Sequence, residues 1–381
     1  MRGHAHAHLS VRVTGLKIRQ FRNLNEVEVI PEKGLNVLVG DNAQGKTSFI
    51  EALYYLSTLR SFRTGKTADL IQKNQNGFLV QGQVESEGHL DLSLEARVVE
   101  KARKLTLNEK PATASSFVTK LRTVVFSPES LESIKSGPEA RRELIDQAVF
   151  QTSEVAATAQ RDYSRVLRQR NACLKSVKTG EFSPEVGEDI LQSLESHFLA
   201  AGVAVIDERL KFLDRLFKKI ERKLEKITGE AAAINFTYQS SHMTWAERKK
   251  DELFDRLRGE LNSKERRHAE RSTGVTLTGP HRHDITFLFN GNDSRIFCSQ
   301  GQQRAVILAF KIAEIVYHSE AFGSYPLLLL DDVLSEFDEG KRRFLIEFLK
   351  NSEAQTFLTT TDQTHFLKGS RVFHVRAGQV I

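Results

Sequence analysis

The sequence predicts an α/β fold that is assembled from both ends of the chain and interrupted by an inserted helical region. A glycine-rich loop at residues 40–47 lies between a strand-like and a helix-like segment. Strand patterns occur near both termini, whereas residues 141–271 are charged, poor in proline and mostly helical in period. The 381 residues are enough for about two or three domains and a large core.

The loop at residues 40–47 has the spacing of a phosphate-binding loop, a glycine followed after four residues by Gly-Lys-Thr. Its backbone N–H groups would surround phosphate, Lys46 would reach the β- and γ-phosphates of ATP, and Thr47 would bind Mg²⁺. The alternative interpretation is an ordinary glycine-rich turn. The residues predicted to contact the nucleotide are Gly40, Asp41, Asn42, Ala43, Gln44, Gly45, Lys46 and Thr47.

Alternating and apolar segments predict the strands around this loop. Residues 16–60 read as strand, turn, strand, phosphate loop and helix, and residues 78–110 read as an antiparallel meander. A further strand is expected at residues 123–126. The later predicted elements are strands at 284–289 and 294–297 joined by Asn290-Gly291, a helix at 301–317, a strand at 327–330, a helix at 341–349, a strand at 355–360 and a hairpin at 371–381.

The middle of the chain predicts an arm of helices. From Ile206 to Ile227, apolar residues alternate spacings of four and three, which fits a short coiled coil or an ordinary helical bundle equally well. Leu253, Leu257 and Leu261 form a second apolar stripe, and residues 233–238 look like an isolated strand. We therefore expect a flexible extension or tag at 1–15, a head domain formed by 16–130 and 275–381, and an inserted arm at 131–274.

Two adjacent carboxylates follow a run of four leucines at residues 327–330. At the carboxyl end of a parallel strand beside a phosphate loop, Asp331 would hold Mg²⁺ and Asp332 would orient or deprotonate the attacking water. Ser335 and Asp338 follow shortly afterwards, and either could cap the next helix.

A small motif at residues 298–304, Cys-Ser-Gln-Gly-Gln-Gln-Arg, precedes the next predicted helix. Ser299, Gly301 and Gln302 would stand at the helix N-terminus, where backbone N–H groups and the helix dipole favour an anion. The motif resembles the signature motif of ATP-binding-cassette (ABC) ATPases. In that superfamily the motif binds the γ-phosphate of the nucleotide held by a second subunit.

The chain as a whole resembles the RecF family, because matching segments follow one another in order along nearly its whole length. Besides the phosphate loop and the signature motif, these segments are 21–24, 61–63, 126–129, 141–142, 278–282, 329–336 and 359–362. In place of an expected acid, His283 follows the 278–282 segment. The resemblance implies a phosphate-loop ABC-type ATPase head, with an antiparallel β-subdomain and a short helical arm, like those of Rad50 and SMC proteins.

The resemblance also implies a function and partners. The implied function is ATP-dependent homodimerisation on DNA, in which Ser299 acts in trans and Ser335 and Asp338 belong to a dimer loop. The implied activity is slow, DNA-stimulated ATP hydrolysis without nuclease activity. The implied work is repair and replication restart at gaps and stalled forks, helping RecO and RecR to load RecA. Arg60 and Arg63 lie where SMC-like heads carry an arginine that couples DNA to nucleotide, although they could simply be solvated.

Composition agrees with this function without establishing it. The net charge is +6, which is compatible with nucleic acid, and duplex or gapped DNA fits better than stacked single strands because few aromatic residues accompany the basic ones. Two cysteines and no long apolar stretch or apolar leader favour a protein of the reducing cytoplasm without membrane contact. The resemblance implies that this cytoplasm is bacterial and that the protein is associated with the nucleoid. The alternatives are an ATP-binding structural clamp or adaptor with negligible turnover and a transporter-type ABC subunit.

Overall fold

The computed structural model describes most of the chain and divides it into two compact units. The described residues are 9–86, 91–100, 102–228, 231–240, 243–361 and 369–381. The first unit comprises Met1–Glu132, Ile220–Ala231 and Ser299–Ile381, and the second comprises Ser133–Lys219 and Ala232–Cys298. The first unit is therefore built from both ends of the chain, as the fold class predicts.

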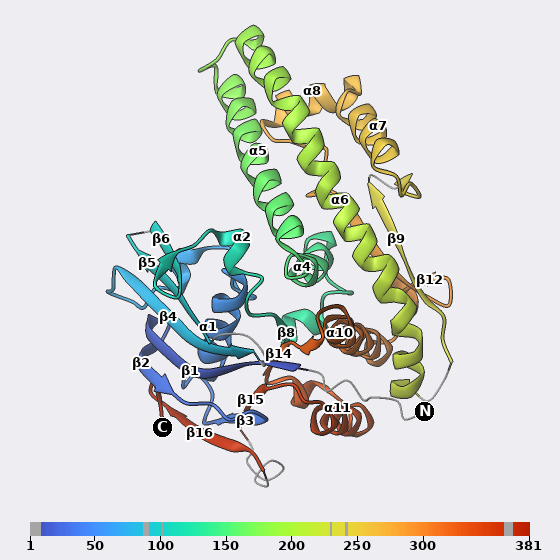
Figure 1. Ribbon diagram of the computed structural model, residues 1–381. Coiled ribbons are helices and arrows are strands. Elements are labelled where there is room, and N and C mark those ends of the chain that lie inside the picture. The colour runs from blue at the N-terminus through green and yellow to red at the C-terminus, as the bar shows by residue number, and fades with distance from the viewer. Residues whose placement is uncertain (1–8, 87–90, 101, 229–230, 241–242, 362–368) are drawn as a thin grey trace, which may run out of the picture. The chain divides into compact units, whose positions relative to one another are not determined.

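The core of the first unit is a six-stranded sheet in the order β17-β16-β3-β15-β14-β8. Neighbouring strands are parallel except for β17 at the edge, which is antiparallel to β16. Figure 1 shows the red β16 beside the blue β3, so the two ends of the chain meet in one sheet. The strands are β3 (Leu35–Val39), β8 (Thr123–Phe126), β14 (Leu327–Asp331), β15 (Thr356–Thr360), β16 (Arg371–Arg376) and β17 (Gln379–Val380).

The first unit also contains the helices that the sequence predicts after these strands. Strand β14 is buried along its whole length, which explains its unbroken run of leucines. The longer helices are α1 (Lys46–Thr58), α10 (Gln300–Phe322) and α11 (Glu339–Asn351). The short ones are η1 (Thr67–Leu70), α2 (Ala114–Phe117), α3 (Pro128–Leu131) and η2 (Val333–Glu336).

A second, mainly antiparallel sheet confirms the predicted meander. Its order is β13-β1-β4-β5-β6-β7, and β2 pairs with β1. The strands are β1 (Leu9–Phe21), β2 (Leu24–Val29), β4 (Gly77–Ser86), β5 (Leu92–Val99), β6 (Ala102–Leu107), β7 (Lys110–Pro111) and β13 (Ser324–Tyr325).

Strand β1 begins earlier than the sequence suggests. It pairs with β13 at Leu9 and with β4 from Val11 onward. The predicted flexible extension is therefore wrong for residues 9–15, because partners distant in sequence order them as a strand. Residues 1–8 lie outside the described part of the chain.

The second unit contains long helices and a small sheet in the order β10-β9-β11-β12. Its helices are α4 (Pro138–Val149), α5 (Glu154–Thr179), most of α6 (Pro184–Thr228), α7 (Lys250–Leu261), α8 (Lys264–Thr273) and α9 (Ser294–Phe297). Its strands are β9 (Ile234–Ser240), β10 (Met243–Thr244), β11 (Asp284–Phe289) and β12 (Asn292–Asp293).

Three details of this unit differ from the sequence analysis. Residues 294–297 form helix α9 rather than a strand, because the Asp293 side chain accepts a hydrogen bond from the Arg295 N–H and caps a helical turn. Strand β9 is not isolated, since it pairs with β10 and β11. That pairing places residues 275–298 in the second compact unit and not with the C-terminal part of the first. The functional division into head and arm stays a prediction.

The apolar seam of α6 packs inside the fold. Phe217 contacts Phe236 of β9 and Phe287 of β11, with ring centroids 4.9 and 5.5 Å apart. Of the two interpretations left open by the spacing, ordinary packing of a helix against neighbouring elements accounts for this part of the seam.

The segment 278–284, part of which resembles the RecF family, is the polar core of the second unit. Arg209 of α6 donates two hydrogen bonds to Asp146 of α4, at 2.7 and 2.8 Å, and one to the Pro280 carbonyl at 2.7 Å. Arg209 and Asp146 are buried. A buried arginine with a bidentate carboxylate partner locks three chain segments together.

Two histidines complete this core. His281 Nδ1 lies 2.5 Å from the Tyr163 hydroxyl, and His283 Nδ1 lies 3.2 Å from the Tyr238 hydroxyl. Burial, followed by nearby positive charges, holds the pKa of His283 well below its usual value, and burial lowers the pKa of His281 to about 4. Both histidines are therefore neutral at pH 7.

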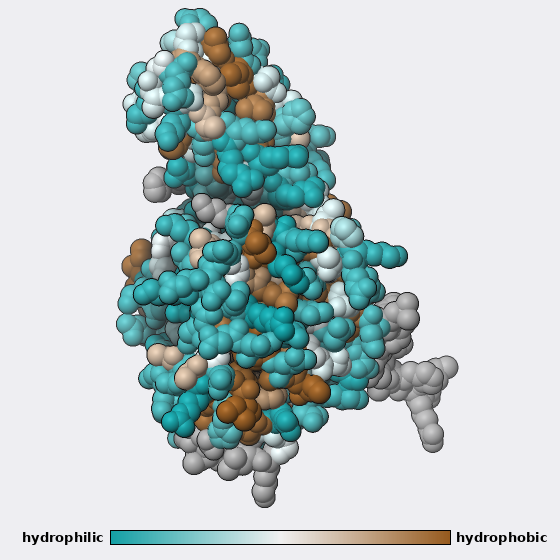
Figure 2. Space-filling model, turned by 90° about the vertical axis from the view of Figure 1, so that its left-hand side faces the viewer, coloured by the Kyte–Doolittle hydropathy of each residue, from teal (hydrophilic) through white to brown (hydrophobic). Residues whose placement is uncertain are grey.

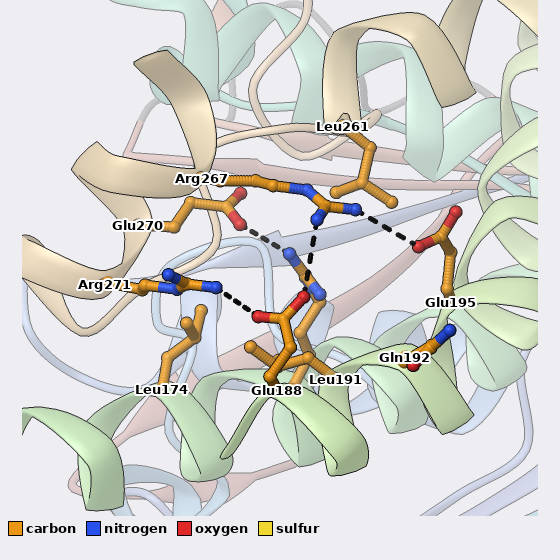
Figure 3. A pocket seen from close by; sticks show the side chains of 10 residues that line it. Leu174, Glu188, Leu191, Gln192, Glu195, Leu261, Arg267, Glu270 and Arg271 are labelled. Atoms are coloured by element: carbon orange, nitrogen blue, oxygen red, sulfur yellow. Dashed lines mark hydrogen bonds and ion pairs between the residues drawn. The ribbon is translucent and has the colours of Figure 1, made fainter. Parts of the chain in front are cut away.

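A charged network joins α8 to α5 and α6. Figure 3 shows Arg267 and Arg271 of α8 directed at Glu188 of α6, with Arg267 also reaching Glu195. Beneath them, Arg170 of α5 pairs with Glu270 of α8, and both are buried. Since three arginines face three glutamates, this cluster balances its own charge and is explained as a link between helices.

The surface in Figure 2 is mainly hydrophilic, with hydrophobic side chains gathered in small patches. Within the described ranges, no helix is long and apolar enough to cross a membrane.

Candidate nucleotide-binding site

The phosphate loop stands where the sequence predicts, between the end of β3 and the start of α1. Gly45 is the N-cap of α1 and has φ +120°, a conformation that favours glycine. A Cβ atom at Gly40 would lie 2.3 Å from the Val375 carbonyl oxygen, so glycine is required there for close backbone packing. The loop thus presents the N-terminus of a 13-residue helix, as an anion site needs.

Lys46 is held inside its own loop. Its ammonium group donates hydrogen bonds to the carbonyl oxygens of Gly40 at 2.6 Å and Asp41 at 2.8 Å. Burial lowers the pKa of Lys46, while the carboxylates of Asp332, Asp331 and Asp41 oppose that shift. A nucleotide phosphate would offer this cation a stronger, charged partner than two carbonyls.

Thr47 and Asp331 converge although they are distant in sequence. The Thr47 hydroxyl donates to Asp331 Oδ1 at 2.9 Å, and the Thr359 hydroxyl donates to the same oxygen at 3.0 Å. Burial raises the pKa of Asp331, and these two hydrogen bonds oppose the shift. A hydroxyl and one carboxylate oxygen beside a phosphate site are donors that suit Mg²⁺, which usually keeps several waters. The donor set therefore fits the predicted metal.

Asp332 is placed for a different role from Asp331. Its backbone has φ +51° and its N–H donates to the Thr359 hydroxyl at 2.9 Å. This left-handed turn leaves Asp332 exposed and lining the cavity beside the loop, while Asp331 is buried. The pair thus consists of one buried carboxylate that accepts hydrogen bonds from Thr47 and Thr359 and one exposed carboxylate that lines the cavity.

The loop opens on a cavity of about 520 Å³, a size typical of ligand sites. Its lining includes Lys46, Thr47, Asp332 and Thr359, and also Arg22 and Asn23 from the β1–β2 turn. No role for Thr359, Arg22 or Asn23 could be predicted from the spacing of residues alone. All three residues lie in the segments 21–24 and 359–362, whose resemblance to the RecF family was the signal that could have indicated their role.

A buried carboxylate supports one wall of this cavity. Glu51 of α1 is fully buried and accepts two hydrogen bonds from Arg22, at 2.9 and 2.7 Å. Arg63 approaches the same carboxylate at 3.7 Å, and the Ser61 hydroxyl donates to it. Of the two predicted coupling arginines, Arg63 therefore lines the cavity, whereas Arg60 is exposed and is not among the lining residues.

The signature-like motif lies at an exposed helix start. Ser299 caps α10 by accepting from the Gln302 N–H at 3.2 Å, and the Gln302 side chain accepts from the Ser299 N–H at 2.9 Å. Ser299, Gly301 and Gln302 are exposed. Among the described residues that line the cavity, none comes from this motif.

The dimer-loop candidates follow Asp332. The Ser335 hydroxyl donates to the Asp332 carbonyl at 2.7 Å, and Asp338 caps α11 by accepting from the Lys341 N–H at 2.9 Å. Of the two alternative caps, the structure uses Asp338. Asp362, at the end of the family-like segment 359–362, lies outside the described residues.

Comparison with known proteins identifies what this arrangement resembles. Residues 12–380 match the family described as the RecF/RecN/SMC N terminal domain. A curated relative from Citrifermentans bemidjiense, called DNA replication and repair protein RecF, is 34% identical over 380 residues, covering 97% of this chain and all of the relative.

Solved structures agree. A structure described as the recombination mediator protein RecF-ATP in the RecFOR pathway is 29% identical, covers 100% of this chain and 99% of its own, and has a TM-score of 0.85. An Smc head domain with an extended coiled coil, bound to the C-terminal domain of ScpA from Pyrococcus furiosus, has a TM-score of 0.54 at 14% identity and shares the fold. On its motifs, its fold and these comparisons, the chain belongs to the RecF family.

Proposed function

We propose that the chain binds and hydrolyses ATP as a homodimer on DNA, during recombinational repair and replication restart. The single observation that carries the proposal is a phosphate-loop cavity that contains Lys46, Thr47 and Asp332 but no signature-like residue among those described. Binding of ATP by a solved RecF and the repair function of the curated relatives support it.

Within one chain, each side chain has a defined task. The loop N–H groups and Lys46 bind the phosphates, and Thr47 and Asp331 hold Mg²⁺. When bound, this ion supplies Lewis-acid stabilisation of the charge that develops on the phosphates. Asp332 orients or deprotonates the attacking water.

The site is completed in trans by a second copy. Ser299 and the first turn of its α10 helix present an exposed serine hydroxyl and the positive end of the helix dipole. ATP therefore connects two chains, and slow hydrolysis separates them.

The ATP-dependent dimer binds DNA through basic residues of the head, with Arg60 and Arg63 as the residues that contact DNA or couple it to the nucleotide. Such contacts weaken steeply as salt rises. The dimer acts in the bacterial cytoplasm at single-strand gaps and stalled forks, where RecO and RecR load RecA.

Mass measurement by light scattering tests the proposal. The wild type is expected to double its mass with ATP, most strongly with duplex or gapped DNA, and to return as ATP is consumed. Asp332→Asn should extend the dimer lifetime, because general-base catalysis contributes about 100-fold or more to a rate. If this variant stayed monomeric with ATP and DNA, the composite site would be rejected.

A matched pair of cap variants separates the signature role from helix capping. Ser299→Ala and Ser263→Ala each remove a serine whose side chain caps a helix, at α10 and α8 respectively. Each should cost about 1 kcal/mol of stability. Only Ser299→Ala should weaken dimerisation while leaving ATP binding by the monomer intact. Phosphate release over many turnovers, with and without duplex DNA, distinguishes an ATPase from a clamp that binds ATP without turnover.

A further inference from the structure

The C-terminal hairpin ends against the phosphate loop. Strand β16 runs parallel to β3, with His374 opposite Val39, and β17 returns antiparallel with Arg376 opposite Gln379. The two residues between them, Ala377 and Gly378, have φ +49° and +76°. Two positive φ values characterise a tight turn of the type I′ class, which fixes the direction of its N–H groups.

Both N–H groups of this turn bind one residue of the phosphate loop. The Ala377 N–H donates to the Gln44 side-chain oxygen at 2.6 Å, and the Gly378 N–H donates to the Gln44 carbonyl oxygen at 3.0 Å. The side chain and main chain of Gln44 are thus held from the same direction. Sequence patterns predict both the hairpin and the loop, but no pattern connects them.

The β1–β2 turn holds the loop from another direction. Asn23 donates to the Ala43 carbonyl at 3.1 Å and accepts from the Ser48 hydroxyl at 2.7 Å. A Cβ atom at Gly378 would lie 2.0 Å from the Asn23 carbonyl oxygen, so the two turns pack backbone against backbone.

We propose that the C-terminal turn Ala377–Gly378 is a positioning element of the nucleotide site, which sets ATP affinity by holding Gln44 and the phosphate loop in their binding conformation. The loop binds phosphate with backbone N–H groups, so its affinity depends on how far these are preorganised. Two hydrogen bonds from a rigid turn reduce the number of conformations that the phosphate loop adopts before the nucleotide binds. The proposal rests on the assignment of residues 40–47 as the ATP site.

The test compares two glycines with the same backbone conformation. Gly378→Ala forces a side chain against Asn23. Gly180 has φ +79°, so Gly180→Ala carries a similar backbone cost, but it causes no clash because a Cβ atom there would meet nothing within 4 Å. Equilibrium binding of a fluorescent ATP analogue to the full chain gives the affinity. Thermal unfolding without nucleotide reports stability.

Gly378→Ala is expected to raise the Kd for ATP about tenfold, roughly the effect of losing one hydrogen bond. Gly180→Ala should bind like the wild type. Ala377→Gly, which keeps the N–H and relieves the positive φ, should also retain wild-type affinity. Hydrogen exchange at residues 40–47 without nucleotide should be faster in Gly378→Ala. A general loss of stability would instead speed exchange outside the loop as well.

A Kd for Gly378→Ala within about twofold of the wild type, with unchanged exchange in the loop, overturns the positioning role. Lys46→Met in the same titration tests the underlying assignment. If Lys46→Met binds normally, the nucleotide site itself is wrong. If Lys46→Met loses binding and Gly378→Ala keeps it, the site stands and the positioning role alone fails.

Discussion

The phosphate loop and the segment 278–284 are both glycine-containing, polar and family-like in sequence, yet the structure uses them in opposite ways. In the loop, Lys46 is held by two carbonyl oxygens and lines a cavity. In the second segment, polar groups are closed against Arg209, Tyr163 and Tyr238 in a buried core. In the loop the matching residues thus face a cavity, whereas in the second segment most matching polar groups pair inside the core and only Arg282 is exposed.

The largest expected effect lies in the loop. Lys46→Met should reduce ATP affinity or hydrolysis by at least about 100-fold, because the variant removes the cation that we propose reaches the β- and γ-phosphates. Stability should change little, since Lys46 donates only to two loop carbonyls. Phosphate release and thermal unfolding measure the two quantities. If Lys46→Met lost stability but kept its ATP affinity, Lys46 would serve the fold and not the nucleotide site.

The next effect is expected in the second segment. Arg209→Met should lower the free energy of unfolding by about 3–5 kcal/mol, because it leaves the buried carboxylate of Asp146 without its partner. Urea unfolding measures the loss. The double variant Arg209→Met/Asp146→Leu should recover part of it, and neither should change ATP affinity per folded molecule. Full stability in the single variant would show that this core is not locked by the pair.

Acid should destabilise the second segment through its two buried histidines. His281 and His283 are neutral in the fold, with pKa values lowered to about 4 and well below 6.5 respectively, mainly by burial. The unfolded chain binds these protons near pH 6.5, so the stability that depends on their neutral state is complete above that pH and is lost as the pH falls toward 4. Unfolding midpoints between pH 7.5 and 4.5 should follow this slope.

His283→Phe provides the control for acid sensitivity. The ring lies against Tyr238 and Trp245, and its Nε2 atom has no hydrogen-bond partner among the described residues. Phenylalanine should therefore fit and reduce the pH dependence of the unfolding midpoint by the part that His283 contributes, while the part from His281 remains. An unchanged slope would assign the acid sensitivity to other groups.

The same contrast explains how much of the site could be predicted from the sequence. The positions of Lys46, Thr47 and Asp331 could be predicted because short spacings fix a loop or a strand end, and their role as site residues stays a prediction. Thr359 and the Ala377–Gly378 turn lie in segments that the sequence marked, but their contacts with that site depend on strand order, which joins residues far apart in the chain.

The fold shows the same limit. Asn290-Gly291 correctly predicted a turn, but capping by Asp293 converted the expected second strand into helix α9. Residues 9–15 look unstructured in isolation and become a strand only beside β4 and β13.

The smallest effect on stability is expected where the signature helix meets the turn after Asp332. Arg304 of α10 donates to the Glu336 carbonyl at 2.5 Å and to its carboxylate at 2.6 Å, but the two side chains are 31% and 35% exposed. Arg304→Met should therefore cost less than about 1 kcal/mol of stability. Because the same contact fixes η2, which follows Asp332 directly, the turnover rate should fall several-fold while the ATP Kd stays unchanged. Equal losses in rate and affinity would instead place Arg304 with the binding residues, and a loss of several kcal/mol would place it with the locked core.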